Sequence, residues 1–362
     1  GKDWETEIES YISEAFLSNL LQFVNDTQYM TKPLTRELMQ KEGIKSFAHI
    51  PISRKGEPPF GILSVFSRTI VGLFNEPFLN LLESLAGQLA QAVKIVTEME
   101  AKEREREEKE RILLENARVV KEMEIAKQIQ LSLLPSAPPT LPGMAVAGRC
   151  KPATHVGGDY YDYFQHGESG ADMVIADVSG HSVGAALIMA ETRSVLRAQA
   201  RSDRSVGEIL ETLNELLHDD LSGAELFITM FYIRYDTRRR LLSYANAGHN
   251  PPLIFRNGQT ACMELDAEGL ILGVKRRVEF EEKQIELQPG DVVLLYTDGI
   301  TEARNPDGEF FGASRLCTFL SVNSDKRADE IIDVILAEVE SFSGGTVIDD
   351  DISMVVLKIL EG

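Results

Sequence analysis

The stretch MVIADVSGHSVGAALIMA at residues 173–190 decides the fold of the C-terminal part of this chain. Its first half is apolar and ends at Asp177, and small and apolar residues follow Gly180. This order predicts a strand, a tight turn and a helix over 181–200. A carboxylate at a strand end is held on a rigid element while its oxygens still face solvent. Asp177 is therefore a candidate functional residue.

Three further aspartates lie at predicted strand ends. Asp159 follows a glycine pair, Asp298 ends the apolar run VVLLYT, and Asp350 precedes ISMVVLKI. Any one of them alone is explained as a turn or helix-cap residue. Together, four such ends can form an all-oxygen site for hard divalent cations. Such a site activates water for attack on a phosphate ester.

Composition excludes several function classes. The net charge of −20 opposes binding to nucleic-acid phosphates, and no basic stripe with aromatic residues is present. No apolar run is long enough to cross a membrane, and the first ten residues lack the features of a signal peptide. Cys150, Cys262 and Cys317 are widely spaced, which predicts reduced thiols and a cytoplasmic protein.

Competing catalytic motifs are absent from the sequence. It contains no Walker A loop, no GxGxxG after a strand and no HExxH. An EF-hand loop starting at Asp298 would need glycine where Ala303 stands. His249 follows a predicted strand and is either structural or directed at the metal site as an acid or hydrogen-bond donor. His181 could likewise cap or orient the helix after Asp177.

Three regions differ in their patterns. Residues 1–97 mix short helices and strands, including a hairpin over 46–68, and residues 98–134 continue a helix that begins near Phe78. The charged run 98–111 predicts a solvated helix with i,i+4 ion pairs. A heptad follows at Ile112, Asn116, Val119, Met123, Ala126, Gln130 and Leu133. This spacing predicts either a coiled-coil dimer or one amphipathic helix docked on its own domain.

Residues 135–362 alternate strands with helices. The predicted strands are 173–178, 227–236, 241–247, 252–258, 278–287, 292–298 and 352–359, and the predicted helices are 181–200, 205–221 and 328–342. The short turn between 236 and 241 makes at least part of the sheet antiparallel. We therefore expect an α+β fold with two packed sheets and helices outside.

Five motifs in this region carry a family resemblance. They are GGDYYD (157–162), ADVSGHSVGAAL (176–187), NAGHNPPL (246–253), YTDGITEA (296–303) and DDIS (350–353). In this order they resemble bacterial metal-dependent protein phosphatases of the stage II sporulation protein E type, a branch of the PPM superfamily. The resemblance implies an α-β-β-α sandwich with two Mn²⁺ or Mg²⁺ ions between the sheets.

The resemblance also implies roles for individual residues. Asp159 and Asp177 would be the catalytic carboxylates nearest the bridging water, and Val178 would offer its backbone carbonyl to a metal. Asp298 and Asp350 would be the remaining metal ligands. Two positions depart from the pattern, since Asp351 replaces a common Asn and Ser182 replaces a common Gly.

The N-terminal region resembles part of a GAF sensor domain, on the segment LTRELMQKEGIKSFAHIPI, the strand GILSVFSR and a closing helix within residues 34–97. We therefore expect a partial GAF-like domain at 1–97, a coiled-coil linker at 98–134 and the phosphatase domain at 135–362. The expected function is a metal-dependent serine/threonine phosphatase in bacterial signalling. The resemblance implies an anti-sigma-factor antagonist as the phosphorylated substrate and a homodimer formed through the linker. An inactive sensor or scaffold and a metal-dependent phosphodiesterase are the alternatives.

Overall fold

The computed structural model describes residues 3–31, 33–54, 56–153, 156–180, 182–201, 204–259, 261–345 and 350–361. The chain forms two compact units, residues 1–116 and 117–362, and each is described on its own.

A three-stranded antiparallel sheet organises the N-terminal unit, in the order β1-β2-β3. Its elements are α1 (Asp3–Ser18), β1 (Gln22–Val24), η1 (Thr27–Tyr29), α2 (Pro33–Lys41), β2 (Ser46–Ile52), β3 (Gly61–Ser67) and the first part of α3 (Glu76–Leu133). Strands β2 and β3 confirm the predicted hairpin. The core is small, with Ala48 and Ile50 of β2 packed against Phe74 and against Leu82 and Ala86 of α3.

Helix α3 is continuous over 58 residues because it contains no proline after its first turn and only one glycine, Gly87. Its charged stretch is solvent-exposed, and Lys109 pairs with Glu105 four residues away at 2.6 Å. The prediction of a solvated helix with i,i+4 pairs is confirmed there.

The predicted heptad divides into two parts. Ile112, Asn116 and Val119 are exposed, whereas Met123 is half-buried and Gln130 is only 8% exposed within the C-terminal unit. The C-terminal part of the pattern therefore follows the docked-helix alternative. A spacing of four and three residues describes any apolar helix face, whether it meets a second chain or the helix's own domain.

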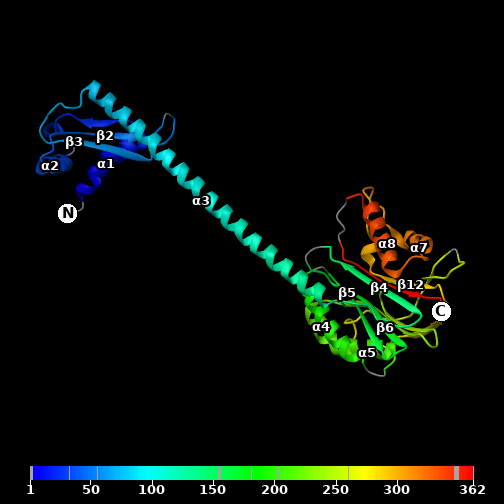
Figure 1. Cartoon of the computed structure of the whole chain (residues 1–362). Helices are drawn as coiled ribbons and strands as arrows, with labels where there is room; N and C mark the ends of the chain where they lie inside the picture. The colour runs from blue at the N-terminus through cyan, green and yellow to red at the C-terminus, as the bar shows by residue number, and fades with distance from the viewer. Residues whose placement is uncertain are drawn as a thin grey trace. The chain divides into compact units, whose positions relative to one another are not determined.

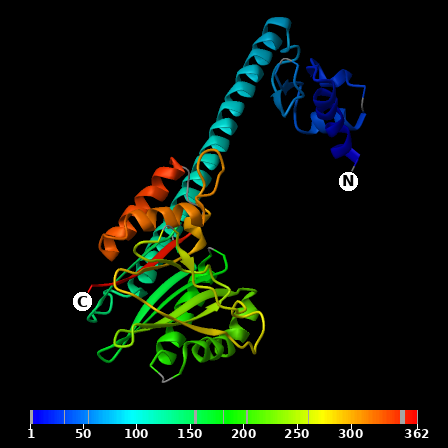
Figure 2. The same ribbon diagram turned by 90° about the vertical axis from the view of Figure 1, so that its right-hand side faces the viewer.

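The C-terminal unit is a four-layer α-β-β-α sandwich, which confirms the expected fold (Figure 1). One sheet has the order β11-β8-β7-β6-β5 and the other β10-β9-β12-β13-β4, and all neighbours are antiparallel. Helices α4 and α5 cover the first sheet, and α7 and α8 cover the second, as the rotated view also shows (Figure 2).

The bounds of these elements are β4 (Met144–Lys151), β5 (Asp159–His166), β6 (Gly170–Val178), α4 (Val183–Gln199), α5 (Val206–Ala224), β7 (Ile228–Asp236), β8 (Leu241–Ala247), β9 (Leu253–Phe255), β10 (Met263–Glu264), β11 (Glu282–Glu286), β12 (Val292–Tyr296), α6 (Asp298–Thr301), α7 (Gly312–Val322), α8 (Ala328–Ser343) and β13 (Ile352–Ile359).

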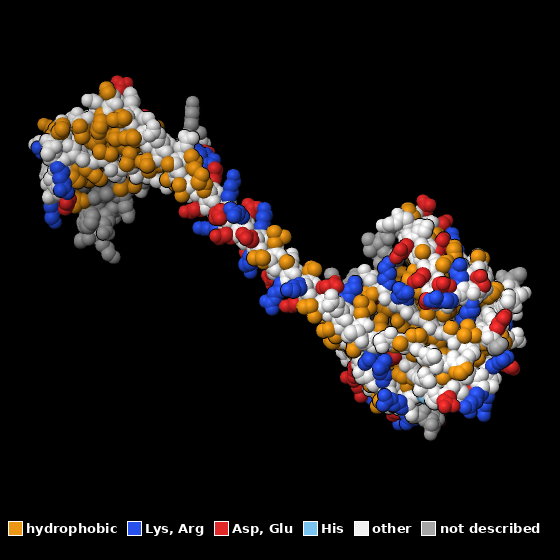
Figure 3. All heavy atoms as spheres, in the orientation of Figure 1, with side chains coloured by type: hydrophobic (Ala, Val, Ile, Leu, Met, Phe, Trp, Pro, Cys, Tyr) orange, Lys and Arg blue, Asp and Glu red, His pale blue; other side chains and the backbone are white. Residues whose placement is uncertain are grey.

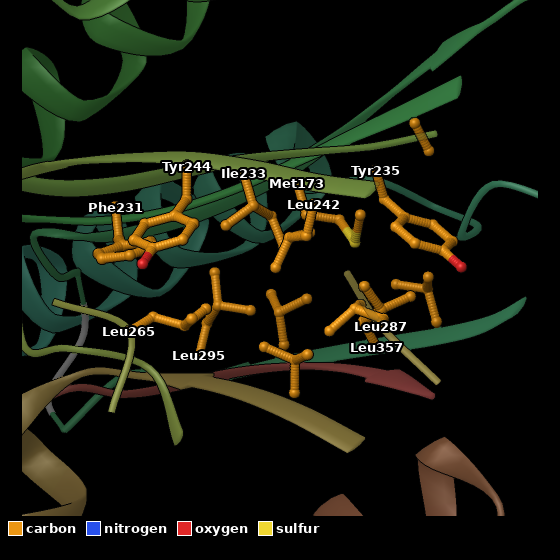
Figure 4. Close-up of a cluster of buried hydrophobic side chains, with 14 of the residues drawn as sticks. Met173, Phe231, Ile233, Tyr235, Leu242, Tyr244, Leu265, Leu287, Leu295 and Leu357 are labelled. Atoms are coloured by element: carbon orange, nitrogen blue, oxygen red, sulfur yellow. The ribbon is translucent and has the colours of Figure 1, made fainter. Parts of the chain in front are cut away.

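The main core lies between the two sheets. Met173 and Ile233 point from β6 and β7 toward Leu295 and Leu357 of β12 and β13 (Figure 4). Because the helices bury the outer faces too, β12 is buried at every position. This explains why its sequence is an uninterrupted apolar run rather than an alternating one.

In the described part of the C-terminal unit, three strands (β4, β5 and β10) and two helices (α6 and α7) lie outside the predicted elements. Strand β5 reads DYYDYFQH, in which polar residues hide the pattern because Asp159 and Asp162 are buried with partners. Strand β4 reads MAVAGRCK, in which small and basic residues interrupt the apolar pattern, and α7 begins at Gly312, which has φ of 76°.

The prediction of three reduced thiols is wrong for two of them. Cys262 and Cys317 form a disulfide, with Sγ atoms 2.11 Å apart and a sequence separation of 55. The chain returns from β10 to α7 after passing through β11 and β12, and this long-range approach leaves no mark on local spacing. Cys150 remains a free thiol. In the described residues, no helix combines the length and the apolar character that a bilayer crossing requires.

Candidate active site

Paired strands bring the predicted acidic residues to one edge of the sandwich. Asp159 begins β5 and lies directly opposite Asp177 on β6. Asp298 follows β12 and opens α6, while Asp350 precedes β13, the antiparallel partner of β12. Each sheet therefore contributes two of the four strand-end aspartates. Thr297, directly before Asp298, donates a 2.8 Å hydrogen bond to the Asp159 carboxylate, so the ends of β12 and β5 lie side by side.

Asp351 joins this group and is more deeply placed than the sequence indicates. Its side chain is 3% exposed, and its Oδ1 accepts a 2.8 Å hydrogen bond from the Ala153 amide. Its Oδ2 lies 3.5 Å from the amide nitrogen of Asp159. Neighbouring Asp350 is exposed and accepts a hydrogen bond from the Asp351 amide at 2.8 Å. Asp351 thus links the start of β5 to the start of β13.

Thr297 is a site residue that sequence reasoning missed. It is fully buried and donates from Oγ1 to Oδ2 of Asp159 at 2.8 Å. The Oγ1 of Thr297 also accepts a hydrogen bond from the Ser353 amide at 2.9 Å. These bonds fix the Asp159 carboxylate from the opposite sheet. The only sequence signal is its position directly before Asp298 in YTDG, where a small hydroxyl side chain follows an aromatic residue.

Two carboxylates of the cluster, Asp159 and Asp177, have raised pKa values because they are buried close to other acids. Burial and the nearby Asp298, Asp350 and Asp351 raise the pKa of Asp177 to about 8. Burial, followed by Asp177 and Asp351, raises the pKa of Asp159 well above its usual range, although hydroxyl donors oppose the shift. Like charges held this close disfavour ionisation unless a cation lies between them.

Glycines leave room for these oxygens. A Cβ on Gly158 would stand 2.2 Å from the Val178 carbonyl oxygen and 3.0 Å from Oδ1 of Asp177. The two oxygens therefore face the same small space, as the predicted role of Val178 requires. A Cβ on Gly299 would likewise stand 2.1 Å from the Asp351 carbonyl oxygen. Any larger residue at either position would displace the backbone that carries the acids.

Divalent cations such as Mn²⁺ or Mg²⁺ match this donor set in their chemistry. Carboxylates and a backbone carbonyl are the ligands that both cations prefer. In the described residues, no three Asp, Glu, His or Cys side chains are placed to hold one ion together. The fit rests on oxygen chemistry, mutual charge repulsion and the space above Gly158. Asp159, Asp177, Val178, Asp298 and Asp350 are the residues that would hold the ions.

The loop after β6 is fixed by short contacts. The Ser179 amide donates to the Phe227 carbonyl at 2.9 Å, and the Ser179 hydroxyl accepts the Phe227 amide at 3.0 Å. Gly180 has φ of 83°, a conformation that favours glycine. Ser182 has φ of −98° and caps α4 through the Ala185 amide, so no glycine is needed at that position. His181 lies outside the described residues.

His249 is placed as a structural residue rather than as an acid. Its Nδ1 lies 2.8 Å from the Thr229 hydroxyl, and its Nε2 lies 3.2 Å from the Tyr296 carbonyl oxygen. Burial lowers the pKa of His249 to about 4, so the ring is neutral near pH 7. Neutral imidazole donates through one nitrogen and accepts through the other, which matches these two partners. His249 therefore ties β7, opposite Asp177, to the end of β12.

Two family models match this chain. The model for Stage II sporulation protein E (SpoIIE) matches residues 167–360, more than half of the sequence. A GAF domain model matches residues 7–94, which includes residues N-terminal to the segment 34–97 on which the GAF resemblance rests.

Among curated proteins, "Phosphoserine phosphatase RsbU" of Bacillus subtilis (strain 168) is 29% identical over 240 residues, covering 66% of this chain and 70% of RsbU. The solved SiaA-PP2C domain of Pseudomonas aeruginosa superposes with a TM-score of 0.60 at 23% identity, covering 67% of this chain and 98% of that domain, and so shows the fold. The structure of the RsbU and RsbW domains of Rv1364c from Mycobacterium tuberculosis superposes with a TM-score of 0.51 at 26% identity, covering 62% of each chain.

Proposed function

This chain belongs to the SpoIIE family as a PP2C-type serine/threonine phosphatase with an N-terminal GAF domain, and we propose that its substrate is a phosphorylated anti-sigma-factor antagonist. The observation that carries the enzymatic part is the meeting of Asp159, Asp177, Asp298 and Asp350 at one sandwich edge. The substrate class is supported by the family resemblance and by relatives named for RsbU and RsbW.

The proposed chemistry uses two Mn²⁺ or Mg²⁺ ions, which supply water activation and neutralise phosphoryl charge when bound. The chain's part is to hold oxygens at fixed positions. Asp177 would hold metal together with Asp298 and Asp350, whose negative charges raise its pKa when no cation is bound. Thr297 holds the Asp159 carboxylate against rotation. No cysteine nucleophile is required.

The direct test is release of phosphate from candidate phosphoproteins with Mn²⁺ titrated into the full chain. A phosphoserine peptide and a nucleic-acid diester are compared under the same conditions. Hydrolysis of the phosphoprotein supports the proposal. Hydrolysis of the diester alone would favour the phosphodiesterase alternative, and no turnover of any substrate with saturating Mn²⁺ would favour the inactive scaffold.

We further propose a homodimer formed through α3. Leu85, Leu89, Ala92, Val96 and Met99 follow the alternating four- and three-residue spacing of a coiled coil, and all are exposed. Hydrophobic side chains gather on the N-terminal unit and the first turns of α3 (Figure 3). A second copy of the chain would cover them. This proposed dimer contact lies N-terminal to the heptad at 112–133 on which the sequence prediction was based.

The GAF domain would act as the sensor, with α3 as its connection to the phosphatase domain. Comparison of Mn²⁺ activation curves for residues 1–362 and 117–362 tests this regulation. The cut at 117 keeps the compact catalytic unit, whereas a cut at 135 would remove Leu134, which packs into the core. Superimposable curves would mean that the sensor does not control the site.

We propose that the catalytic unit works in the cytoplasm, where phosphorylated signalling proteins occur. Disulfides are rare in that compartment, so the Cys262–Cys317 bond supplies a test. Thiol labelling of protein trapped in intact cells should find both cysteines reduced if the location is cytoplasmic. Persistent protection of both thiols would contradict it.

A further inference from the structure

We propose that Gln130 is a positioning residue for the acidic cluster, because its side-chain amide fixes the Gly157 backbone, against which the Asp351 carboxylate packs. This inference rests on the proposed metal-dependent function and names a residue that neither the sequence motifs nor the chemistry described above assigns to the site. Gln130 lies in α3, far from the acids in sequence, and contacts none of their carboxylates itself.

The amide of Gln130 pairs with both polar groups of one residue. Nε2 donates to the Gly157 carbonyl oxygen at 2.6 Å, and Oε1 accepts the Gly157 amide at 3.0 Å. Gln130 is 8% exposed, so water competes little for these bonds. Two antiparallel hydrogen bonds of this kind fix both the position and the tilt of the Gly157 backbone.

Gly157 in turn packs directly against a carboxylate of the acidic cluster. A Cβ at this position would stand 1.7 Å from Oδ2 of Asp351, closer than any side chain can approach. The next residue, Gly158, stands in the same way against the Val178 carbonyl and the Asp177 carboxylate. A shift of about 1 Å in this short segment would therefore disturb three oxygens of the site. Metal sites tolerate such shifts poorly because ligand distances are narrowly defined.

The end of α3 is anchored where Gln130 needs it. Arg193 of α4 donates from Nε to the Leu133 carbonyl oxygen at 2.6 Å. Leu134 packs against the core between the sheets and also against the core beneath α4 and α5. These contacts fix the position and rotation of the last turn of α3 on the C-terminal unit. Because Gln130 lies in this part of the helix and bonds to Gly157, the position of Gly157 depends on that of the helix. A helix end that loosened would therefore let the Gly157–Gly158 segment shift, and with it the oxygens of Asp351, Val178 and Asp177 that lie against this segment.

A purely structural role for Gln130 predicts something different. A buried amide that is merely satisfied would affect the free energy of unfolding when removed. A positioning role predicts weaker metal binding in protein that is still folded. Partners that orient metal ligands typically change metal affinity by about 10- to 100-fold when they are removed.

The test replaces Gln130 by Met, which keeps the length of the side chain and removes both hydrogen bonds. Gln128→Ala is the matched control, because Gln128 is exposed on the same helix. Calorimetry with Mn²⁺ alone is expected to show about tenfold or greater loss of affinity for Gln130→Met and none for Gln128→Ala. Activity of Gln130→Met should recover most of its kcat at saturating Mn²⁺, with the whole curve displaced to higher metal concentration.

A second readout needs no metal. The Gly157 amide should exchange with deuterium slowly in the wild-type chain and faster in Gln130→Met, while the amides of β13 remain unchanged. If Gln130→Met loses its cooperative unfolding transition, Gln130→Asn, whose shorter amide cannot reach both groups, is measured in the same way. Unchanged Mn²⁺ affinity and unchanged Gly157 exchange in a folded variant would overturn the inference. Failure of the wild-type chain to bind Mn²⁺ at all would instead overturn the proposed function.

Discussion

The two units of this chain differ in how far they bury their apolar side chains. The C-terminal unit buries them in three clusters, one between the sheets and one beneath each helical layer. In the described part of the N-terminal unit the clusters are smaller, and large side chains such as Leu17, Tyr29 and Leu81 are more than half exposed. The C-terminal unit therefore has the larger buried core, and the N-terminal unit has the apolar surface that the proposed dimer would cover.

A buried histidine occurs in each unit and repeats the contrast. His249 uses both ring nitrogens, with Thr229 and Tyr296 as partners, and so connects the two sheets. The Nδ1 of His49 lies 2.8 Å from the Ser64 hydroxyl, and its ring lies beside the rings of Phe47 and Phe66. The first is a cross-link between layers, and the second is a polar group within one sheet. The following experiments test how far the difference between the units extends.

The largest expected effect is on catalysis. Replacing Asp177 by Asn should lower phosphatase activity by about a thousandfold or more, because the site loses a charge that two dications require. The unfolding temperature of the metal-free protein should stay the same or rise, since repulsion from neighbouring acids is relieved. Asp307→Asn, at an exposed turn, is the control. Turnover near the wild-type value at saturating Mn²⁺ would mean that Asp177 is not a metal ligand.

The next effect concerns association of the N-terminal unit. Replacing Leu89 and Val96 together by Lys should dissociate the proposed dimer, because two charges per chain would face the apolar seam. Sedimentation at tens of micromolar should then give a monomer with unchanged helical content. Ile95→Lys is the control, as Ile95 is exposed but lies beside the seam. A wild-type chain that is already monomeric would contradict the dimer proposal.

Shortening an apolar side chain to alanine should lower the free energy of unfolding much more in the core of the C-terminal unit than on the exposed face of α3. Met173→Ala, between the sheets, should cost about 2–5 kcal/mol in the free energy of unfolding of the catalytic unit. Leu85→Ala, on the exposed face of α3, should change the stability of a monomeric chain by about 0.5 kcal/mol or less. Chemical denaturation followed by circular dichroism measures both. An equal loss of unfolding free energy in both variants would mean that Leu85 is as important for stability as the core residue Met173.

The smallest effect is a pH dependence of stability. Burial lowers the pKa of His249 to about 4, so the unfolded chain takes up a proton more readily than the folded one. Stability is therefore lost as pH falls from the ordinary value of about 6.5 toward 4, by about 2 kcal/mol between pH 7 and pH 5. His249→Gln, although less stable at pH 7, should show a flatter profile over this range. An unchanged slope would mean that His249 does not titrate as its burial requires.

The acidic strand ends could be predicted because each lies in a short segment with its own signal. Asp177 and Asp298 end apolar runs, Asp159 follows a glycine pair, and Asp350 precedes an apolar run. The contributions of Thr297, Asp351 and Gln130 could not be predicted, because each acts on a residue more than twenty positions away in the sequence. The disulfide was missed for the same reason. The heptad was ambiguous because docking on the chain's own domain and pairing with a second chain need the same spacing. Strand β5 was hidden because its acids are buried with partners rather than exposed.

The disulfide between Cys262 and Cys317 has a consequence for the denatured chain. It closes a loop with a sequence separation of 55, and that loop contains Asp298, whereas Asp159 and Asp177 lie outside it. By loop-closure entropy a bond of this span removes freedom from the unfolded ensemble worth about 4 kcal/mol. Recovery of activity after heating should then depend on the reducing agent present during heating, because only the oxidised chain keeps the segment around Asp298 within a closed loop while unfolded.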